Sequence, residues 1–204
     1  MAGKDWLNAI LKRNSRLSIR RPEATSLSRA TSFNRNNVSG FYDKLNTILS
    51  RDELTASCIW NLDGTGVSTV SKPSEIIAEK GKRTFGSITS GERGTNVTLI
   101  AAVSASGRSI PPMFIFPRKK FQEHFIRDGT PECIGAGNKS GWVTDEEFFI
   151  FMQHFIKHVK PTKDEPVFIL LDNHSSHISV KTLDLAKDNG ICMLTFPPYF
   201  SHKL

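Results

Sequence analysis

The chain has 204 residues, of which 38% are hydrophobic, and a formal net charge of +7. That length allows one domain with a sizeable core together with a small helical unit, and the composition is typical of a folded protein. No apolar run approaches the length that crosses a bilayer and the first six residues lack the apolar core of a signal peptide, so we expect a protein of the cytosol or nucleus.

The three cysteines give no sign of a disulfide framework or a zinc ribbon. Cys58, Cys133 and Cys192 are odd in number, widely spaced and without a CxxC pair. We expect reduced, mostly buried thiols.

Positive charge is concentrated near the N-terminus. Residues 1–40 hold eight lysines and arginines against two acidic residues, a net +6, so the remaining residues share only +1. Clustered basic residues favour a polyanionic partner such as nucleic acid, because phosphate binding depends on them. A solvated basic tail is the alternative interpretation.

The basic segment has a helical pattern. Residues 4–13 have apolar positions at helical spacing, a second helix is predicted to open near Pro22, and a third is predicted from about Val38 to Leu49. Two helices joined by a basic connection are typical of a helix-turn-helix DNA-binding module, although many ordinary helical surfaces share the pattern. The residues expected to contact phosphates are Lys12, Arg13, Arg16, Arg20, Arg21 and Arg29.

Strand patterns begin at Cys58. The apolar run 58–62 leads into Asp63, and we expect Gly64 and the two residues after it to form a turn. Residues 96–103 and 110–116 are predicted to form a hairpin through the polar loop 104–108. Pro111 and Pro112 favour an edge position for the second of these strands.

The rest of the chain alternates between helix and strand. A capping box at Thr144 predicts an apolar helix, and the uninterrupted apolar run 167–171 predicts a central strand that ends at Asp172. A helix over 180–187, capped by Asn189 and Gly190, precedes a buried strand at 191–196. The order predicts an α/β fold with one mixed sheet and helices packed on it.

Asp63 and Asp172 are the candidate catalytic and metal-ligating residues. Acidic residues at the ends of neighbouring buried strands lie where open α/β sheets place their sites, and carboxylates suit Mg²⁺ or Mn²⁺. Capping of loops is the competing interpretation for two such aspartates. His174 and His177 form an HxxH that suits either hydrogen bonding or a transition metal, but no further ligand stands nearby in the sequence.

Five blocks of sequence, taken together and in this order, resemble the DDE superfamily of pogo, Tigger and jerky-like transposases. They are residues 59–70 (IWNLDGTGVSTV), 92–94 (ERG), 110–119 (IPPMFIFPRK), 170–177 (LLDNHSSH) and 196–204 (FPPYFSHKL). The resemblance implies an RNase H-like fold that cuts and joins DNA, with Asp63 and Asp172 as the first two metal-binding acids. Residues 6–37 resemble the end of a centromere protein B-type helix-turn-helix region, which implies DNA as partner and the nucleus as location.

Three departures from that family pattern affect the expected activity. Gly64 stands where the family usually has Glu, and Tyr199 stands where the closing motif usually has His. No residue is left after this motif to supply the third acid. The first half of the DNA-binding region is also missing, so we expect modest, salt-sensitive DNA affinity.

The leading hypothesis is therefore a nuclear, transposase-derived DNA-binding protein whose DDE endonuclease domain is incomplete and catalytically impaired. The expected units are a basic helical segment at 1–50 and the nuclease domain at 51–204. An active Mg²⁺- or Mn²⁺-dependent endonuclease and a decayed element without a selected role are the alternatives. We expect no membrane partner and no small-molecule substrate, and we leave a homo-oligomer open.

Overall fold

A computed structural model describes residues 3–15, 34–52, 54–68 and 96–197. Its centre is a six-stranded sheet with the order β4-β3-β2-β1-β5-β6. The strands are β1 (Ile59–Ser68), β2 (Asn96–Ser104), β3 (Met113–Pro117), β4 (Ile134–Asn138), β5 (Val167–Leu171) and β6 (Ile191–Thr195). β1, β2 and β3 pair in antiparallel fashion, whereas β3–β4, β1–β5 and β5–β6 are parallel pairs. The predicted mixed sheet is confirmed.

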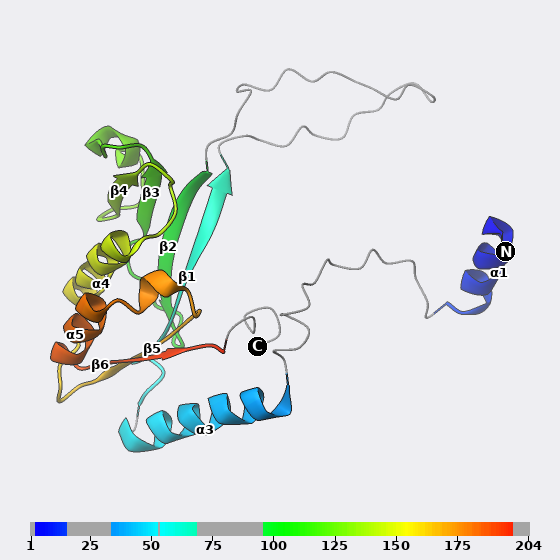
Figure 1. Cartoon of the computed structure of the whole chain (residues 1–204), viewed down its shortest axis with the longest axis horizontal. Helices are drawn as coiled ribbons and strands as arrows, with labels where there is room; N and C mark the ends of the chain where they lie inside the picture. The colour runs from blue at the N-terminus through cyan, green and yellow to red at the C-terminus, as the bar shows by residue number, and fades with distance from the viewer. Residues whose placement is uncertain (1–2, 16–33, 53, 69–95, 198–204) are drawn as a thin grey trace.

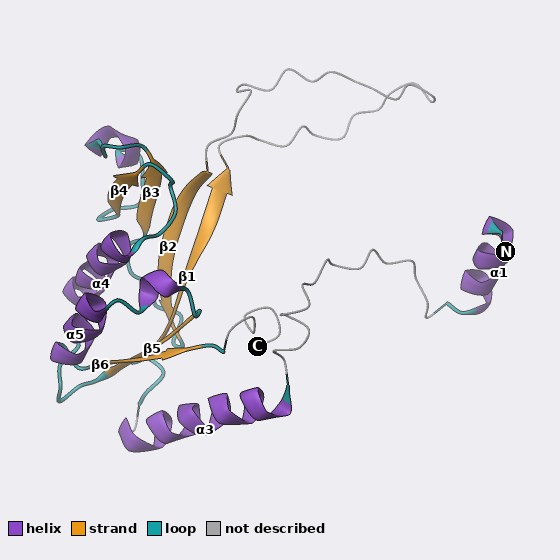
Figure 2. Cartoon of the chain, in the orientation of Figure 1, coloured by secondary structure: helices purple, strands orange, loops and turns teal. Residues whose placement is uncertain are grey.

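Two helices cover one face of this sheet. α4 (Asp145–Val159) and α5 (Val180–Asp188) lie side by side over it (Figure 2). Side chains alternate between the two faces of a strand, and the alternate positions Trp60, Leu62, Ile100 and Ile169 are at most 1% exposed. They pack with the α4 phenylalanines, among which the Phe155 ring meets Trp60 edge-on at 5.3 Å. This contact layer forms the hydrophobic core of the domain.

Local sequence signals account for both covering helices. Thr144 and Glu147 form the predicted capping box, in which the Glu147 carboxylate accepts the Thr144 backbone N–H at 3.1 Å. α5 begins after Ser179, whose hydroxyl accepts the Thr182 N–H at 3.3 Å, and ends at Asn189. Both predictions are confirmed.

The predicted N-terminal helices are described in part. α1 (Lys4–Arg13) and α3 (Arg35–Asp52) confirm the first and third of them. Phe41 of α3 is buried, and its ring centroid lies 5.5 Å from that of Phe196, the residue just after β6. The helix predicted near Pro22 lies outside the described residues. In the described part of the chain no helix is long and apolar enough to span a membrane.

The predicted hairpin is confirmed, but the predicted edge position of its second strand is wrong. β3 lies inside the sheet because β4 pairs with its other side. Pro111 and Pro112 precede the strand, so they remove no ladder donor, and both of their carbonyls accept hydrogen bonds. β4 itself has no counterpart among the sequence predictions.

The turn predicted at Gly64 is also wrong. β1 continues through this position to Ser68, and Gly64 pairs with Ile100 in a nine-residue ladder with β2. The long antiparallel partner satisfies the backbone of this stretch, so tertiary pairing overrides the low strand preference of Gly64 and Gly66. Asp63 therefore lies within a strand and does not follow one.

A buried histidine on α4 gives the domain a predictable pH dependence. His154 is 6% exposed, its Nε2 lies 2.8 Å from the Pro111 carbonyl, and burial lowers its pKa below the ordinary value. Nearby His158 and Lys157 act in the same direction, whereas the Pro111 bond and Glu132 oppose it.

We expect the free energy of unfolding to fall as the pH drops from 7.5 to 5.5. Because the pKa of His154 is lowered in the folded chain, a proton binds His154 in the unfolded chain at a higher pH than in the folded chain. The folded state therefore has its full stability above the ordinary histidine pKa and loses stability as the pH falls below it. Urea titrations at several pH values measure this slope. His154→Gln keeps a donor for Pro111 without titrating and should flatten the curve, whereas an unchanged slope would contradict the assignment.

Candidate active site

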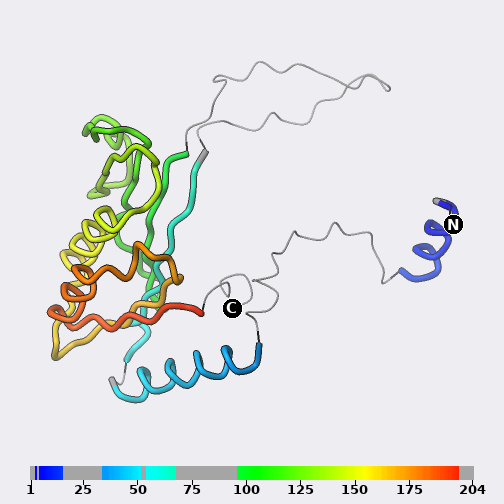
Figure 3. Tube along the Cα trace, in the orientation of Figure 1, coloured from blue at the N-terminus to red at the C-terminus, as the bar shows by residue number. Residues whose placement is uncertain are grey.

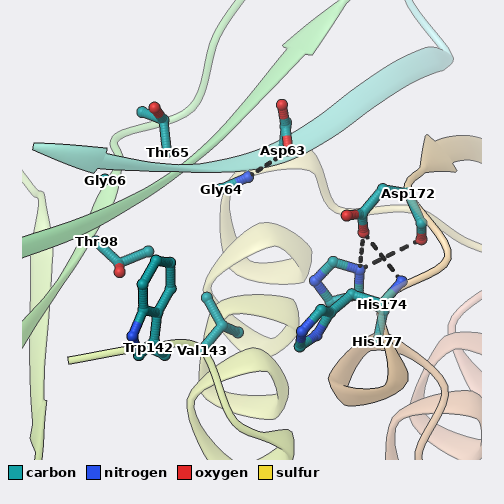
Figure 4. A pocket seen from close by; sticks show the side chains of 10 residues that line it. All are labelled: Asp63, Gly64, Thr65, Gly66, Thr98, Trp142, Val143, Asp172, His174 and His177. Atoms are coloured by element: carbon teal, nitrogen blue, oxygen red, sulfur yellow. Dashed lines mark hydrogen bonds and ion pairs between the residues drawn. The ribbon is translucent and has the colours of Figure 1, made fainter. Parts of the chain in front are cut away.

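A pocket of about 260 Å³ lies beside β1, just beyond the end of β5 (Figure 4). Both predicted aspartates line it. Its lining residues are Asp63, Gly64, Thr65, Gly66, Thr98, Trp142, Val143, Asp172, His174 and His177. The tube in Figure 3 shows how the chain returns to place β5 against β1, which brings Asp172 next to a strand 109 residues earlier.

Asp172 is held in place by the turn that follows it. His177 Nδ1 lies 2.8 Å from Asp172 Oδ1, and the His174 backbone N–H donates to the same oxygen at 3.2 Å. The hydrogen bond from His177 holds the pKa of Asp172 below its ordinary value, and the His174 N–H adds to the effect against partial burial. Asp172 is therefore ionised at neutral pH.

The two histidines act as hydrogen-bonding groups. The His177 side chain is 7% exposed and its ring centroid lies 4.2 Å from that of Phe148 on α4, which fixes the orientation of the imidazole. His174 Nδ1 lies 2.7 Å from the Ser176 hydroxyl and accepts the Ser176 N–H at 3.4 Å. The hydrogen-bonding interpretation of the HxxH is the one that the structure supports.

Asp63 lines the same pocket but points differently. A Cβ at Gly64 would lie 3.8 Å from Val143 Cγ2 and 3.9 Å from Thr98 Cγ2, so position 64 faces the pocket. Because neighbouring strand residues face opposite sides, Asp63 leaves β1 on the other face. Its Oδ1 accepts the Gly64 N–H at 2.8 Å, and Figure 4 shows the carboxylate apart from the two histidines. The structure brings the two aspartates to one pocket without joining their carboxylates.

The donor chemistry of the pocket includes one ionised carboxylate, that of Asp172. Carboxylate oxygens are the ligands that Mg²⁺ and Mn²⁺ prefer, and Asp172 offers an ionised one. A two-metal site holds its ions about 3.5–4 Å apart and needs several bridging oxygens. Within the described residues no three histidines, cysteines or acids lie close enough to hold a metal ion.

Sequence reasoning missed the aromatic member of the site. Trp142 lines the pocket and is 61% exposed. Its only sequence signal is the presence of a large apolar residue within a loop of Asn, Lys, Ser and Gly, just before the helix cap at Thr144. Exposure of such a residue depends on how the loop folds.

The predicted DNA-contacting residues are described only in part. Lys12 and Arg13 are exposed in the last turn of α1, where the Arg13 Nε donates to the Ala9 carbonyl at 3.2 Å. The predicted residues at positions 16, 20, 21 and 29 lie outside the described residues. The basic residues Arg118–Lys120 are exposed after β3.

A match to a family model gives the class of protein. A family model for the DDE superfamily endonuclease matches residues 94–204, slightly more than half of the chain. The chain therefore belongs to the DDE superfamily endonuclease family. The predicted family resemblance is confirmed at this level.

Individual relatives extend the comparison. The chain resembles the solved structures "Crystal structure of a pre-cleavage Mos1 transpososome" (TM-score 0.59, 13% identity) and "Crystal structure of the Mos1 mariner paired end complex with Mn" (TM-score 0.54, 14% identity). These comparisons cover 96% and 94% of this chain but 52% and 51% of the Mos1 chains, so the chain spans about half their length. The likeness confirms the predicted α/β, RNase H-like fold.

A curated relative matches the sequence more narrowly. The protein "MFS-type transporter clz9" of Cochliobolus lunatus is 33% identical over 113 residues. The match covers 53% of this chain and 12% of that protein. It supports descent of this segment from a shared ancestor, while the transport named there concerns the other protein.

Proposed function

We propose that the chain is a transposase-derived DNA-binding protein of the nucleus, of the pogo, Tigger and jerky-like group. Three features support this: the net +6 charge of residues 1–40, the sequence blocks described above, and the fold shared with Mos1 transposase. Another of the Mos1 structures is a "paired-end complex with left transposon end", and clustered cations suit such a duplex. Residues 6–37 would be the remnant of a centromere protein B-type helix-turn-helix.

We further propose that its endonuclease site binds one Mg²⁺ or Mn²⁺ and is catalytically impaired. The observation that carries this proposal is the face occupied by each residue: Gly64 faces the pocket without a carboxylate, while Asp63 is directed to the other face. Asp172 would be the principal ligand, and His177 would keep its carboxylate oriented. A bound cation supplies the Lewis acidity that phosphodiester hydrolysis needs, and a pair supplies much more.

A plasmid-nicking assay tests the impairment. Supercoiled plasmid is incubated with the chain in Mg²⁺ and in Mn²⁺, beside Asp172→Ala and the surface control Asp184→Asn. We expect the unsubstituted chain to nick the plasmid no faster than Asp172→Ala does. Robust nicking that Asp172→Ala abolishes and Asp184→Asn retains would replace the proposal with that of an active endonuclease, which the placement of both aspartates at one pocket favours.

A decayed element without a selected role is the remaining alternative. Such a product has no reason to retain a cooperative core, whereas the layer between α4 and the sheet predicts one. Circular dichroism during thermal unfolding separates the two. A single cooperative transition is expected, and a broad, gradual loss of signal would favour decay.

DNA affinity should depend on the basic N-terminal segment. We expect the double substitution Arg20→Gln and Arg21→Gln to weaken duplex binding for all sequences alike, because phosphate contacts carry no sequence information. The slope of log affinity against log salt should fall by about 1 for each phosphate contact removed. Fluorescence anisotropy at several salt concentrations measures both effects, and unchanged binding would remove the helix-turn-helix from the proposal.

A further inference from the structure

Trp142 presents a large apolar surface at the edge of the candidate active site. The residue is 61% exposed although it lines a pocket shared with Asp63 and Asp172. Figure 4 shows its indole beside Thr98 and Val143, across the pocket from the two histidines. Of the other two tryptophans, Trp60 is buried in the core, whereas Trp6 on α1 is also exposed. The core of this domain therefore makes little use of the Trp142 ring.

The loop that carries Trp142 is firmly anchored. Asn138 Oδ1 accepts the backbone N–H groups of Ser140 at 3.0 Å and Gly141 at 2.6 Å, and Asn138 Nδ2 donates to the Trp142 carbonyl at 2.8 Å. From β2, the buried Thr98 hydroxyl donates to the Gly141 carbonyl at 2.6 Å. Gly141 has φ +71, which glycine adopts without strain. The backbone that carries the exposed indole is therefore held in place.

Exposed basic residues lie in this loop and in the segment after β3 on which it packs. Gly141 packs closely on Pro117, since a Cβ at Gly141 would lie 3.0 Å from Pro117 Cβ. The exposed basic residues Arg118–Lys120 follow Pro117 directly, and Lys139 is exposed in the Trp142 loop itself. An exposed aromatic ring flanked by cations is the combination by which proteins bind single-stranded nucleic acid, with bases stacked on the ring and phosphates held by the cations.

We infer that Trp142 stacks on an unpaired nucleobase of a DNA strand at this pocket, with the flanking phosphates held by Arg118–Lys120 and Lys139. The inference rests on the proposed function and adds the form of DNA that the site receives. Bases within a duplex have both faces covered by their neighbours, so only an unpaired or extruded base offers a face to the indole. Gly64 and Gly66 also line the pocket without side chains, and a Cβ at Gly66 would meet nothing within 4 Å, so β1 leaves room for a strand there.

Fluorescence titration of the full chain tests this inference. Trp6→Phe serves as the background, because it leaves the buried Trp60 and the exposed Trp142 as the two emitters. The probes are a short oligothymidylate and a blunt duplex of the same length. We expect the oligothymidylate to quench the Trp142 emission, and Trp142→Ala to weaken its binding by about 5- to 150-fold, the range typical of one stacked base. Trp142→Phe, which keeps an aromatic face, should lose less, and duplex affinity should change little.

The outcomes separate the inference from the proposed function. If neither probe binds the parent protein, DNA binding itself fails and the inference falls with it. If the probes bind but Trp142→Ala binds the oligothymidylate as tightly as the parent, only the stacking inference is overturned. A change of Trp142 emission with protein concentration in the absence of DNA would instead assign the indole to contact with a second copy of the chain.

Discussion

Replacing Gly190 with alanine is expected to destabilise the domain by about 2–6 kcal/mol, a large effect for one added methyl group. Gly190 follows α5 with φ +70, so a side chain is strained there. The added Cβ would also lie 2.1 Å from the Thr162 carbonyl oxygen and 2.8 Å from the Lys163 nitrogen. These are backbone atoms beside the start of β5, so they cannot move aside cheaply.

Gly107 provides the matched control for this substitution. It has φ +84, and a Cβ there would meet nothing within 4 Å. Gly107→Ala should therefore cost only the backbone strain, about 1–3 kcal/mol. Urea unfolding of both variants measures the difference. Equal losses would show that the close approach of Thr162 to Gly190 does not exist in the folded protein.

Substitution at Asp172 should have the largest effect on cation binding. Asp172→Asn keeps an oxygen for His177 but removes the negative charge. Loss of an outer ligand contact typically lowers metal affinity by roughly 10- to 100-fold, and we expect the affinity for Mn²⁺ to fall by at least that factor. Isothermal titration calorimetry with Mn²⁺ alone measures it. Asp184→Asn, on the exposed side of α5, is the control for net charge and should bind as the parent does.

Gly64→Glu tests the same site in the opposite direction. The pocket has room for a side chain at this position, since the nearest atoms to a Cβ lie at ordinary contact distances. A carboxylate there would face the pocket that Asp172 lines, so Mn²⁺ affinity should rise, because carboxylate count tunes such affinities. Two results together would exclude this pocket as the cation site: full Mn²⁺ affinity in Asp172→Asn, and no increase in Mn²⁺ affinity in Gly64→Glu.

Most of the sheet and both covering helices could be predicted, because their signals are local. β5 is an unbroken aliphatic and aromatic run, and α4 starts at a capping box. β4 was not predictable, because its sequence IGAGN has low strand propensity. Its glycines are required by tertiary packing: a Cβ at Gly135 would lie 2.1 Å from the Phe121 ring, and one at Gly137 would lie 2.7 Å from the Arg118 carbonyl.

The sequence indicated which two aspartates form the candidate site but not how their carboxylates are oriented. Acidic residues on two buried runs indicated that Asp63 and Asp172 would be neighbours, and parallel pairing of β1 with β5 places them at one pocket. The face of the sheet from which each carboxylate projects depends on how far β1 extends beyond Asp63. Pairing with β2 determines that extension. The exposure of Trp142 likewise follows from its anchored loop.

The pairing of β1 with β5 also has a consequence for how the protein is made. Ile59 pairs with Phe168, so the middle of the sheet cannot close until the ribosome has delivered the second partner more than a hundred residues later. Until then one edge of β1 has no ladder partner, and closing so long a loop slows folding. We expect the nascent chain to depend on chaperones during this interval, and its refolding in the test tube to compete with aggregation.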